Sequence, residues 1–436
     1  MKIDALIHAK WIIPVEPKNA VYENYSIAIK DGKIEAIIPT DKANTKYTAT
    51  EEHNLPQHAL IPGLINAHTH AAMNLFRGLA DDLPLMEWLN DHIWPAEGKW
   101  VNPDFVKDGT ELAIAEMIRG GTTCFNDMYF FPDQTAEVCT RIGMRVVVGL
   151  ILIDFPTAWA NDADEYIFKG EKVHDTYRHD SLVNTAFAPH APYTVSDDPL
   201  KRINVIAEEL DIPIHMHIHE TAFEVTQSVE QHGKRPIQRL SELGLLSPRM
   251  LAVHMTQLEQ DEIKELAKLG VSVAHCPESN LKLASGFCPV GDLIKAGVNV
   301  CLGTDGTASN NDLDMIGEMR TAALLAKGIA NDSTCLDAHN TLKMATLNGA
   351  KALGLDDSIG SLKKDKQADI VAINLDQLET VPLYEPVSQI IYSANRQQVS
   401  DVWIEGKQLL KNRELTNMEY SKLMEKAKEW EVKVKS

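Results

Sequence analysis

The sequence predicts a (β/α)8 barrel of the TIM type, together with a small β-sandwich that both ends of the chain build. Two observations predict this α/β fold class. In the central region, short apolar runs alternate with amphipathic segments, which is typical of βα units in a parallel sheet. Near both chain ends, alternating strands separated by tight turns replace this pattern. An open, doubly wound sheet is the alternative for the central region.

The composition is that of an ordinary globular protein, with 44% hydrophobic and 24% charged residues among 436. Its 42 basic and 62 acidic residues give a formal charge of −20, which disfavours nucleic acids and anionic membranes as partners. The charge does not disfavour a small neutral or zwitterionic substrate. Six cysteines without C-x-x-C spacing and an N-terminus unlike a signal peptide predict reduced thiols and a cytoplasmic location.

We expect residues 1–58 and 366–436 to form the small β-sandwich domain. In both segments, alternating strands flank an acidic residue followed by glycine, namely 25–30 and 33–38 around Asp31-Gly32, and 399–403 and 407–410 around Glu405-Gly406. These are hairpin signals. Residues 368–373 predict a further strand, and the charged stretch 419–435 has the period of a surface helix.

Residues 59–365 are expected to form the barrel. Eight strand candidates lie in this region, at 61–68, 122–128, 145–153, 183–189, 213–219, 251–254, 271–275 and 298–303. Helical segments lie between them, for example 105–119, 200–210, 261–269 and 315–327. In such a barrel the functional groups lie at the C-terminal ends of the strands, where the loops begin.

Histidine or aspartate occurs at five of the eight strand ends. These residues are His68 and His70, then His190, then His215, His217 and His219, then His254, and finally Asp305. A hydrogen-bonded core histidine is the ordinary explanation for any one of them, but not for the set. Because side chains alternate along a strand, His68 and His70 share one face. The three histidines of the fifth strand also share a face, so spacing alone does not decide which of them binds a metal.

Three imidazoles and one carboxylate, with a position left for water, are typical of a catalytic zinc or iron(II) site. Glu220 lies where the fifth strand gives way to a loop, and it could transfer protons without being a ligand. The sequence therefore predicts one divalent metal ion per subunit, with Zn²⁺ as the first candidate and Fe²⁺ as the second.

A family resemblance rests on four motifs, namely residues 62–70 (PGLINAHTH), His217-x-x-Glu220, His254 and Gly303-Thr304-Asp305-Gly306. Together they resemble the amidohydrolase superfamily over nearly the whole chain. The sequence is most similar to its mononuclear deaminase branch, specifically the 5-methylthioadenosine/S-adenosylhomocysteine deaminases. The resemblance assigns the fifth-strand ligand to His217, and it thus implies a metal set of His68, His70, His217 and Asp305.

The resemblance implies hydrolytic deamination of an adenine nucleoside to the inosine analogue and ammonia. The nucleoside would be 5′-methylthioadenosine, S-adenosylhomocysteine or adenosine. Glu220, His254 and Asp305 would be the catalytic residues, and Glu220 and Asp305 would also contact the substrate. Barrels of this family often associate, so a homo-oligomer is expected.

Further matches concern the substrate. In the family, a tryptophan is followed nine residues later by a glutamate that holds the ribose hydroxyls, as with Trp88 and Glu97 here. Trp94 would add a second flat apolar wall. The alternative for this segment is an amphipathic surface helix whose tryptophans face the barrel. His190 matches a histidine that contacts the purine nucleoside, and Ser309 matches a serine that contacts the base.

One departure concerns residues 153–160, where some members carry arginines that hold the homocysteine carboxylate. This segment contains no arginine, so methylthioadenosine is better supported than S-adenosylhomocysteine. A second enzymatic interpretation is an aminohydrolase of a free guanine, oxopurine or triazine. The Trp88 and Glu97 pairing argues against it, because free bases have no ribose diol. A third interpretation, an inactive binding scaffold, conflicts with a ligand set in which every position is filled.

Overall fold

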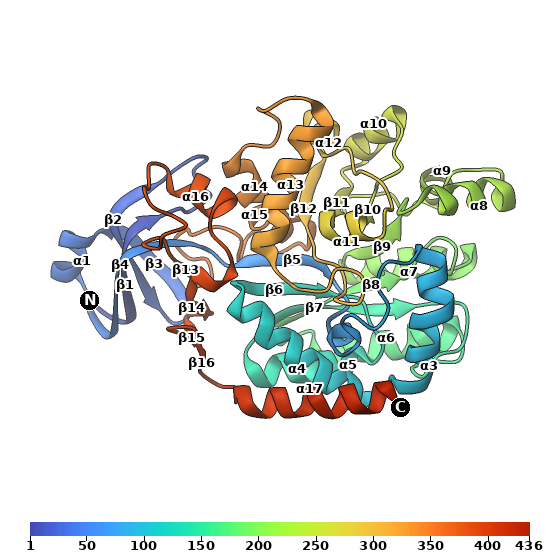
Figure 1. Cartoon of the computed structure of the whole chain (residues 1–436), viewed down its shortest axis with the longest axis horizontal. Helices are drawn as coiled ribbons and strands as arrows, with labels where there is room; N and C mark the ends of the chain where they lie inside the picture. The colour runs from blue at the N-terminus through green and yellow to red at the C-terminus, as the bar shows by residue number, and fades with distance from the viewer. The chain divides into compact units, whose positions relative to one another are not determined.

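The computed structural model describes all residues, 1–436, and the chain divides into two compact units (Figure 1). Unit 1 comprises Met1–Ile65, Ala115–Cys124 and Asp314–Met418, and unit 2 comprises Asn66–Ile114, Phe125–Leu313 and Glu419–Ser436. The division into a sandwich of residues 1–58 and 366–436 and a barrel of residues 59–365 stays a prediction.

Unit 1 is built around one eight-stranded sheet to which both ends of the chain contribute. Its order is β16-β15-β14-β13-β4-β1-β2-β3. The N-terminal strands are β1 (Lys2–Ile12), β2 (Tyr22–Lys30), β3 (Lys33–Pro39) and β4 (Thr48–Pro62), and helix α1 spans Thr40–Lys46. The C-terminal strands are β13 (Ile370–Asn374), β14 (Val399–Ile404), β15 (Lys407–Lys411) and β16 (Glu414–Leu415). Because β13 pairs antiparallel with β4, the predicted joining of the two ends is confirmed.

Both predicted hairpins are present. Asp31 and Gly32 connect β2 to β3 with φ angles of 51° and 75°, and Glu405 and Gly406 connect β14 to β15 with φ angles of 47° and 73°. Positive φ at both central residues is the two-residue turn that matches the twist of paired strands. An acidic residue followed by glycine tolerates this conformation, which is why the sequence signal was specific.

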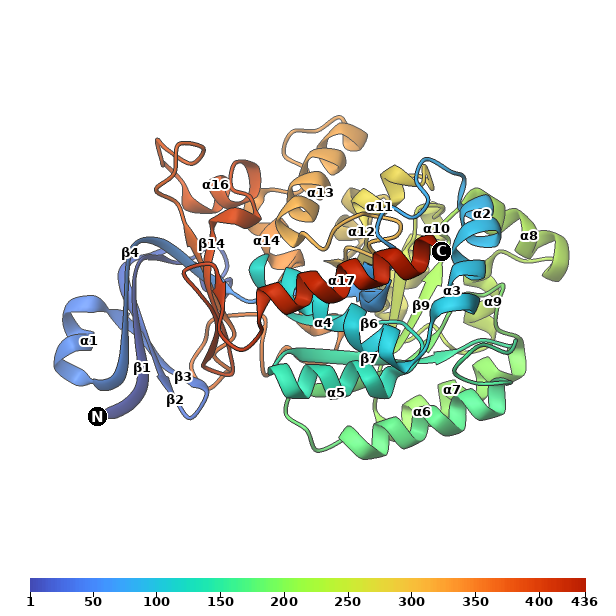
Figure 2. The same ribbon diagram turned by 60° about the horizontal axis from the view of Figure 1, so that its bottom comes forward.

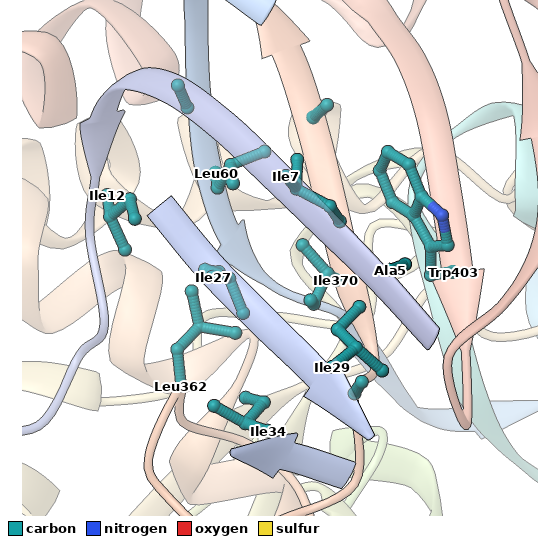
Figure 3. Packing of buried hydrophobic residues seen from close by; sticks show 13 residues of the cluster. Ala5, Ile7, Ile12, Ile27, Ile29, Ile34, Leu60, Leu362, Ile370 and Trp403 are labelled. Atoms are coloured by element: carbon teal, nitrogen blue, oxygen red, sulfur yellow. The ribbon is translucent and has the colours of Figure 1, made fainter. Parts of the chain in front are cut away.

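Alternation along the strands gives this sheet an apolar face on each side. Ile27 and Ile29 of β2 pack in one cluster with Trp403 (Figure 3). Ala28, which lies between them, belongs instead to a second cluster with Tyr47. Period-two burial of this kind follows from the pleat, because neighbouring side chains point to opposite faces.

The second sheet is a near-barrel of eight strands whose spatial order follows the chain. The strands are β5 (Leu64–Thr69), β6 (Thr122–Asp127), β7 (Arg145–Leu152), β8 (Val183–Pro189), β9 (Ile214–Ile218), β10 (Met250–His254), β11 (Ser272–His275) and β12 (Asn299–Leu302). Pairs such as β7 with β8 and β9 with β10 are parallel. The (β/α)8 prediction is therefore confirmed, and the open doubly wound sheet is excluded.

Helices connect the strands along the chain. They are α4 (Pro103–Arg119), α5 (Pro132–Ile142), α6 (Ala163–Tyr177), α7 (Asp197–Leu210), α8 (Ala222–His232), α9 (Pro236–Glu242), α10 (Gln260–Leu269), α11 (Pro277–Lys282) and α12 (Val290–Ala296), with α13 (Met315–Ala330), α14 (Ala338–Met344), α15 (Leu347–Ala352) and α16 (Pro386–Tyr392) after the last strand. Within unit 2, α5 and α6 pack side by side against β7 (Figure 2). The four helical segments predicted from the sequence are all present.

The first barrel strand was predicted at residues 61–68, and the predicted first residue is wrong. β4 ends at Pro62 in the first sheet, and β5 begins two residues later in the second. The Gly63 amide donates to the Asp369 carbonyl (2.9 Å), whereas the Leu64 amide donates to the Gly121 carbonyl (3.0 Å). The chain thus changes sheets within one residue. Because the last four residues of β4 and all of β5 are buried, the apolar run continues across this break and does not reveal it.

The side chain of Asn66 in β5 closes the barrel by bonding to Thr304, which follows β12. The Asn66 Oδ1 atom accepts from the Thr304 amide (2.9 Å), and its Nδ2 donates to the Thr304 hydroxyl (2.7 Å). The Asp305 amide then donates to the His68 carbonyl (3.0 Å). A Cβ at Gly303 would lie 2.8 Å from the His68 nitrogen, so only glycine permits this approach. The closure brings the ends of β5 and β12 together.

The predicted surface helix 419–435 is α17 (Tyr420–Lys435), which belongs to unit 2. Trp430 is buried against Phe105, with ring centroids 5.1 Å apart, and its Nε1 donates to Asp108 (3.0 Å). The six cysteines form no disulfide with one another, and all but Cys335 are buried. None of the helices combines the length and apolar character needed to cross a bilayer.

The crossing between the two sheets can be tested at Gly63. A Cβ there would lie 1.8 Å from the Thr123 hydroxyl oxygen, so Gly63→Ala forces the backbones apart. We expect a destabilisation of about 3 kcal/mol, seen as a fall of several degrees in the thermal unfolding midpoint. The matched control is Gly328→Ala in α13, where a Cβ meets nothing within 4 Å. Equal midpoints for the two variants would contradict the close approach.

Candidate metal centre and active site

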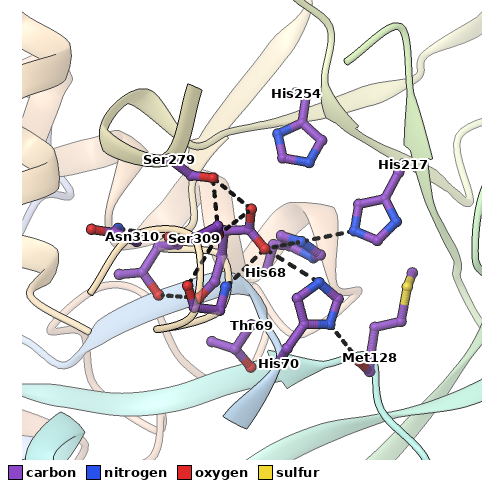
Figure 4. A network of polar contacts seen from close by, with 12 residues as sticks. His68, Thr69, His70, Met128, His217, His254, Ser279, Ser309 and Asn310 are labelled. Carbon is purple, nitrogen blue, oxygen red and sulfur yellow. Dashed lines mark hydrogen bonds and ion pairs between the residues drawn. The ribbon is translucent and has the colours of Figure 1, made fainter. Parts of the chain in front are cut away.

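Four predicted ligands converge at the C-terminal end of the barrel (Figure 4). The ligand atoms of His68, His70, His217 and Asp305 all lie within 4.8 Å of one another. His68 Nε2 is 3.1 Å from His217 Nε2 and 3.2 Å from Asp305 Oδ1, and His70 Nε2 is also 3.2 Å from that oxygen. The structure thus brings together the set that the family resemblance implied.

The outer nitrogen of each imidazole is held by another group. His70 Nδ1 lies 2.6 Å from the Met128 carbonyl, and His217 Nδ1 lies 2.7 Å from the His190 carbonyl. Carbonyl oxygens only accept hydrogen bonds, so these Nδ1 atoms carry the protons and the Nε2 lone pairs point inward. His68 Nδ1 contacts His215 Nε2 at 2.8 Å, which allows the same arrangement. Ligands oriented by such outer partners are typical of metal sites.

The electrostatics of the cluster favour a positive charge. Burial raises the pKa of Asp305, but the hydrogen bonds and charges of His68 and His70 hold it well below its usual range. Burial lowers the pKa of His70, yet Asp305 raises it overall to about 9. Without a metal, the cluster therefore retains a proton. Three inward lone pairs and one carboxylate fit a single divalent ion of the zinc or iron(II) type.

Asp305 is fixed by several donors. Its Oδ2 accepts from the hydroxyls of Ser279 (2.7 Å) and Ser309 (3.1 Å), and its Oδ1 accepts from the Gly306 amide (2.8 Å) (Figure 4). Its backbone has a φ of 65°, in the left-handed region that few residues adopt. This turn directs the carboxylate toward the histidines. Oδ1 faces His68 and His70 and accepts only the Gly306 amide, so it keeps a lone pair for a metal, whereas the two hydroxyls hold Oδ2.

The histidines of β9 do not all share one face, which corrects the expectation from spacing. His215 and His217 are both within hydrogen-bonding distance of His68. His219 lies beyond the strand end with a φ of 55°, and its Nε2 accepts from the Ile237 amide (3.4 Å). The period-two rule holds only inside a strand, and β9 ends at Ile218.

Glu220 and His254 lie beside the cluster. His254 Nδ1 is 2.8 Å from Asn280 Oδ1, and its Nε2 is 3.7 Å from Glu220 Oε2. Burial raises the pKa of Glu220, so its carboxyl group takes up a proton more readily than an exposed glutamate. The Glu220 amide donates to Glu224 Oε2 (2.8 Å), which fixes the chain at this strand end. A carboxyl group of raised pKa next to a metal site can transfer protons near neutral pH.

A pocket lies over the cluster, and the segment after β5 forms one of its walls. This segment contains η1 (Ala71–Phe76), α2 (Leu85–Glu87), the π-helical turn η2 (Trp88–Ile93) and α3 (Trp94–Trp100). Trp88, Trp94 and Glu97 all line the pocket. The segment is helical, as the alternative interpretation expected. However, the face that carries these three residues lines the pocket and does not only pack against the barrel. Burial raises the pKa of Glu97 to about 7, against the opposing influence of the nearby Tyr129 hydroxyl.

His190 and Ser309 also line the pocket. His190 Nδ1 lies 3.2 Å from the Thr194 hydroxyl, and burial lowers its pKa to about 3, so the ring is neutral. Ser309 contacts Asp305 and Ser279, as described above. All seven residues expected to bind the substrate thus lie around one cavity, and their roles stay predictions.

Sequence reasoning missed Tyr129. Its hydroxyl is buried, lines the pocket and makes no hydrogen bond of normal geometry. A buried hydroxyl of this kind is normally satisfied by a ligand or water. Tyr129 lies two residues beyond β6, so the strand-end rule would have found it. The strand-end pattern of histidine and aspartate does not single it out, because tyrosine is not among the usual ligands of zinc.

A buried group of three histidines and one aspartate, beneath a pocket that also holds Glu220, defines a metal-dependent hydrolase built on a (β/α)8 barrel. Residues 59–409 match the model of the amidohydrolase family. Relatives named 5-methylthioadenosine/S-adenosylhomocysteine deaminase occur in Saccharophagus degradans, at 51% identity over 99% of this chain and 97% of the relative, and in Teredinibacter turnerae, at 50% over 99% and 98%. The chain therefore belongs to the amidohydrolase family, and within it to the 5-methylthioadenosine/S-adenosylhomocysteine deaminase family.

Solved structures agree with this assignment. A crystal structure described as an adenosine deaminase from Xanthomonas campestris with bound zinc is 54% identical. It aligns with a TM-score of 0.98 and covers 100% of this chain and 99% of its own. The zinc-complexed atrazine chlorohydrolase from Arthrobacter aurescens aligns with a TM-score of 0.92 over 98% of this chain and 99% of its own, at 23% identity. At this identity, the similarity to the chlorohydrolase shows only that the two proteins share a fold.

The outer partner of His68 provides a test of the metal centre. His215→Ala removes the acceptor that orients His68, while all four ligands remain. We expect zinc affinity, measured by competition with a chromophoric chelator, to fall about 10- to 100-fold. The matched control is His232→Ala at the exposed end of α8, which should leave affinity unchanged. Unchanged affinity in a folded His215→Ala protein would contradict the orienting role.

Proposed function

We propose that this protein catalyses hydrolytic deamination of an adenine nucleoside, releasing the inosine analogue and ammonia. One observation carries the proposal: three of the four ligands (His70, His217 and Asp305) line the same pocket as Glu220 and Glu97. The first two features suit metal-assisted hydrolysis, and a half-buried carboxylate in the pocket wall suits a ribose diol. The names of the relatives in Saccharophagus and Teredinibacter support the same substrate class.

His68, His70, His217 and Asp305 would hold one zinc or iron(II) ion. When bound, such an ion supplies a Lewis acid that makes water a nucleophile at neutral pH. The chain's own residues then position the water and move its protons. Glu220 is the first of these, because its pKa is raised by burial and it lies beside His254.

The proton path follows from which groups can accept and donate. Glu220 takes a proton from the attacking water and delivers it to N1 of the adenine ring, as a C6–O bond forms. His254, whose Nδ1 is fixed by Asn280, presents Nε2 to the water and orients it. Asp305 passes the second proton to the exocyclic amine. The C6–N bond then breaks and ammonia leaves.

The pocket walls would hold the rest of the nucleoside. Glu97 would accept hydrogen bonds from the ribose hydroxyls, and Trp88 and Trp94 would supply flat apolar surfaces. Neutral His190 can either donate to or accept from the purine ring. Ser309 lies beside Asp305 and would contact the base. The substrate is a small molecule, and the homo-oligomeric assembly and cytoplasmic location stay predictions.

A free base is the alternative substrate. Guanine or a triazine brings no ribose hydroxyls to Glu97, so partial desolvation of this half-buried carboxylate by the bound base would not be offset by new hydrogen bonds. The triazine-hydrolysing structural relatives share only 22–23% identity, and they support the fold alone. The nucleoside is therefore preferred.

The role of Glu220 is tested by Glu220→Gln. Because it is not one of the four ligands, we expect metal content to stay at one equivalent while kcat falls at least 100-fold. Metal analysis and ammonia release should be measured on the same sample. A variant that retains near-normal turnover would exclude Glu220 as the proton carrier.

The raised pKa of Glu97 predicts that kcat/KM for a nucleoside depends on pH. Its pKa of about 7 means that the carboxylate is ionised above this pH and protonated below it, so kcat/KM for a nucleoside should decline as the pH falls through 7. Glu97→Gln should remove this decline and reduce kcat/KM by about 10- to 100-fold at pH 8.

The control substrate for Glu97 is 2′,3′-dideoxyadenosine, which lacks both hydroxyls. It should be deaminated at similar rates by the parent protein and by Glu97→Gln. An equal loss for the dideoxynucleoside and for adenosine would show that Glu97 does not recognise ribose.

A further inference from the structure

A buried carboxyl group that the proposed chemistry does not use lies behind Glu220. This group belongs to Glu224, in the first turn of α8, and only 4% of the residue is exposed. Glu220 lines both the pocket over the metal centre and a small cavity beside it, whereas Glu224 lines only the small cavity. An effect of Glu224 on the reaction therefore has to act through a neighbouring residue.

Both carboxyl oxygens of Glu224 accept hydrogen bonds from the chain that follows β9. Its Oε1 accepts from the His219 amide (3.1 Å), and its Oε2 accepts from the Glu220 amide (2.8 Å). Because β9 ends at Ile218, these two buried amides lie outside the strand. A buried amide that lacks an acceptor is costly. His219 also has a φ of 55°, a conformation that the surrounding structure has to hold in place.

These bonds are not the ordinary cap of a helix. Thr221 is the N-cap residue of α8, and its side chain accepts from the Glu224 amide (3.3 Å). In a capping box, the glutamate at this position bonds to the amide of the N-cap residue itself. Here its carboxyl group reaches past Thr221 to the two preceding residues. Glu224 thus holds the segment that carries Glu220, in addition to beginning a helix.

Thr256 holds the carbonyl groups of the same two residues. Its amide donates to the His219 carbonyl (3.0 Å), and its hydroxyl lies 2.7 Å from the Glu220 carbonyl, the closest of the carbonyl oxygens around it. Thr256 follows His254 by two residues, and His254 Nε2 lies 3.7 Å from Glu220 Oε2. Glu224 and Thr256 together therefore provide partners for the amide and carbonyl groups of both residues.

We propose that Glu224 and Thr256 are positioning residues for Glu220. They fix the backbone from which the Glu220 carboxyl group reaches the reacting base beside His254. The proposal rests on the proposed deamination, because a proton carrier has to be positioned only if that reaction takes place. A misplacement of about 1 Å can lower a rate about 100-fold, so hydrogen bonds behind Glu220 can control kcat.

Glu224→Gln tests this role with a side chain of the same size. Glutamine keeps one oxygen as an acceptor, but it turns an NH2 group toward the second backbone amide. We expect kcat for 5′-methylthioadenosine to fall about 10- to 100-fold. KM should stay unchanged because Glu224 does not line the substrate pocket, and metal content should stay at one equivalent.

The matched control is Glu230→Gln, which changes an exposed glutamate of the same helix and should leave kcat unchanged. A folded, zinc-loaded Glu224→Gln protein with the kcat of the parent would overturn the positioning role. A rise in KM at unchanged kcat would overturn it as well.

A double variant separates positioning from a general structural role. In Glu220→Gln the proton carrier is already absent, so adding Glu224→Gln should lower kcat by no more than about twofold further. Losses multiply when two residues act independently, and they do not when one residue acts through the other. A further loss of about tenfold in the double variant would overturn the proposal.

Thr256 supplies a second test that does not depend on the folding of the Glu224 variant. Thr256→Val removes the hydroxyl and keeps the shape of the side chain, whereas Thr256→Ser keeps the hydroxyl. We expect kcat to fall about tenfold in Thr256→Val and to stay near that of the parent in Thr256→Ser. Equal kcat values for the two variants would overturn the role of the Thr256 hydroxyl.

The outcomes for the two proposals are distinguishable. If the zinc-loaded parent protein released no ammonia from adenosine or 5′-methylthioadenosine, the proposed deamination would fail, and the positioning role would fail with it. If the parent released ammonia and Glu224→Gln did so at the same kcat, only the positioning role would fail.

Discussion

The convergence of three imidazole lone pairs on one carboxylate is the constraint on which the rest of this structure depends. His68 Nε2 lies 3.1 Å from His217 Nε2 and 3.2 Å from Asp305 Oδ1 within the protein interior. Lone pairs held this close repel one another, and only a cation or a proton between them offsets the repulsion. The surrounding structure therefore has to hold the cluster together before any metal binds.

The barrel meets this constraint at the ends of its strands. Asn66 replaces a regular strand pairing and brings β5 against the segment that follows β12. His254 and Asp305 turn into the site with φ angles of 74° and 65°, which few non-glycine residues adopt. Helix α11, which follows β11, and the loop after β12 then supply the hydroxyl groups that hold Asp305. Strain at the strand ends is thus part of how His254 and the ligand Asp305 are oriented.

The fold and the metal set were predictable because they leave regular signatures. Apolar runs of strand length and positive-φ turn residues such as Asp31 and Gly32 depend on local physics alone. The resemblance was needed to choose His217 over His215, since both point inward from β9. What could not be predicted depends on tertiary contacts. The chain changes sheets at Gly63 within one apolar run, so the sequence pattern does not show the change. His219 does not share the face of His215 and His217, because the strand ends before it.

The histidine and aspartate cluster makes this protein a metal-dependent nucleoside deaminase, and that dependence can be measured directly. The most direct measurement titrates zinc into metal-free protein while ammonia release from 5′-methylthioadenosine is followed. The structure predicts that activity rises linearly and reaches a plateau at one equivalent of zinc per chain. Full activity in the metal-free protein, or no ammonia release at any zinc concentration, would contradict the account.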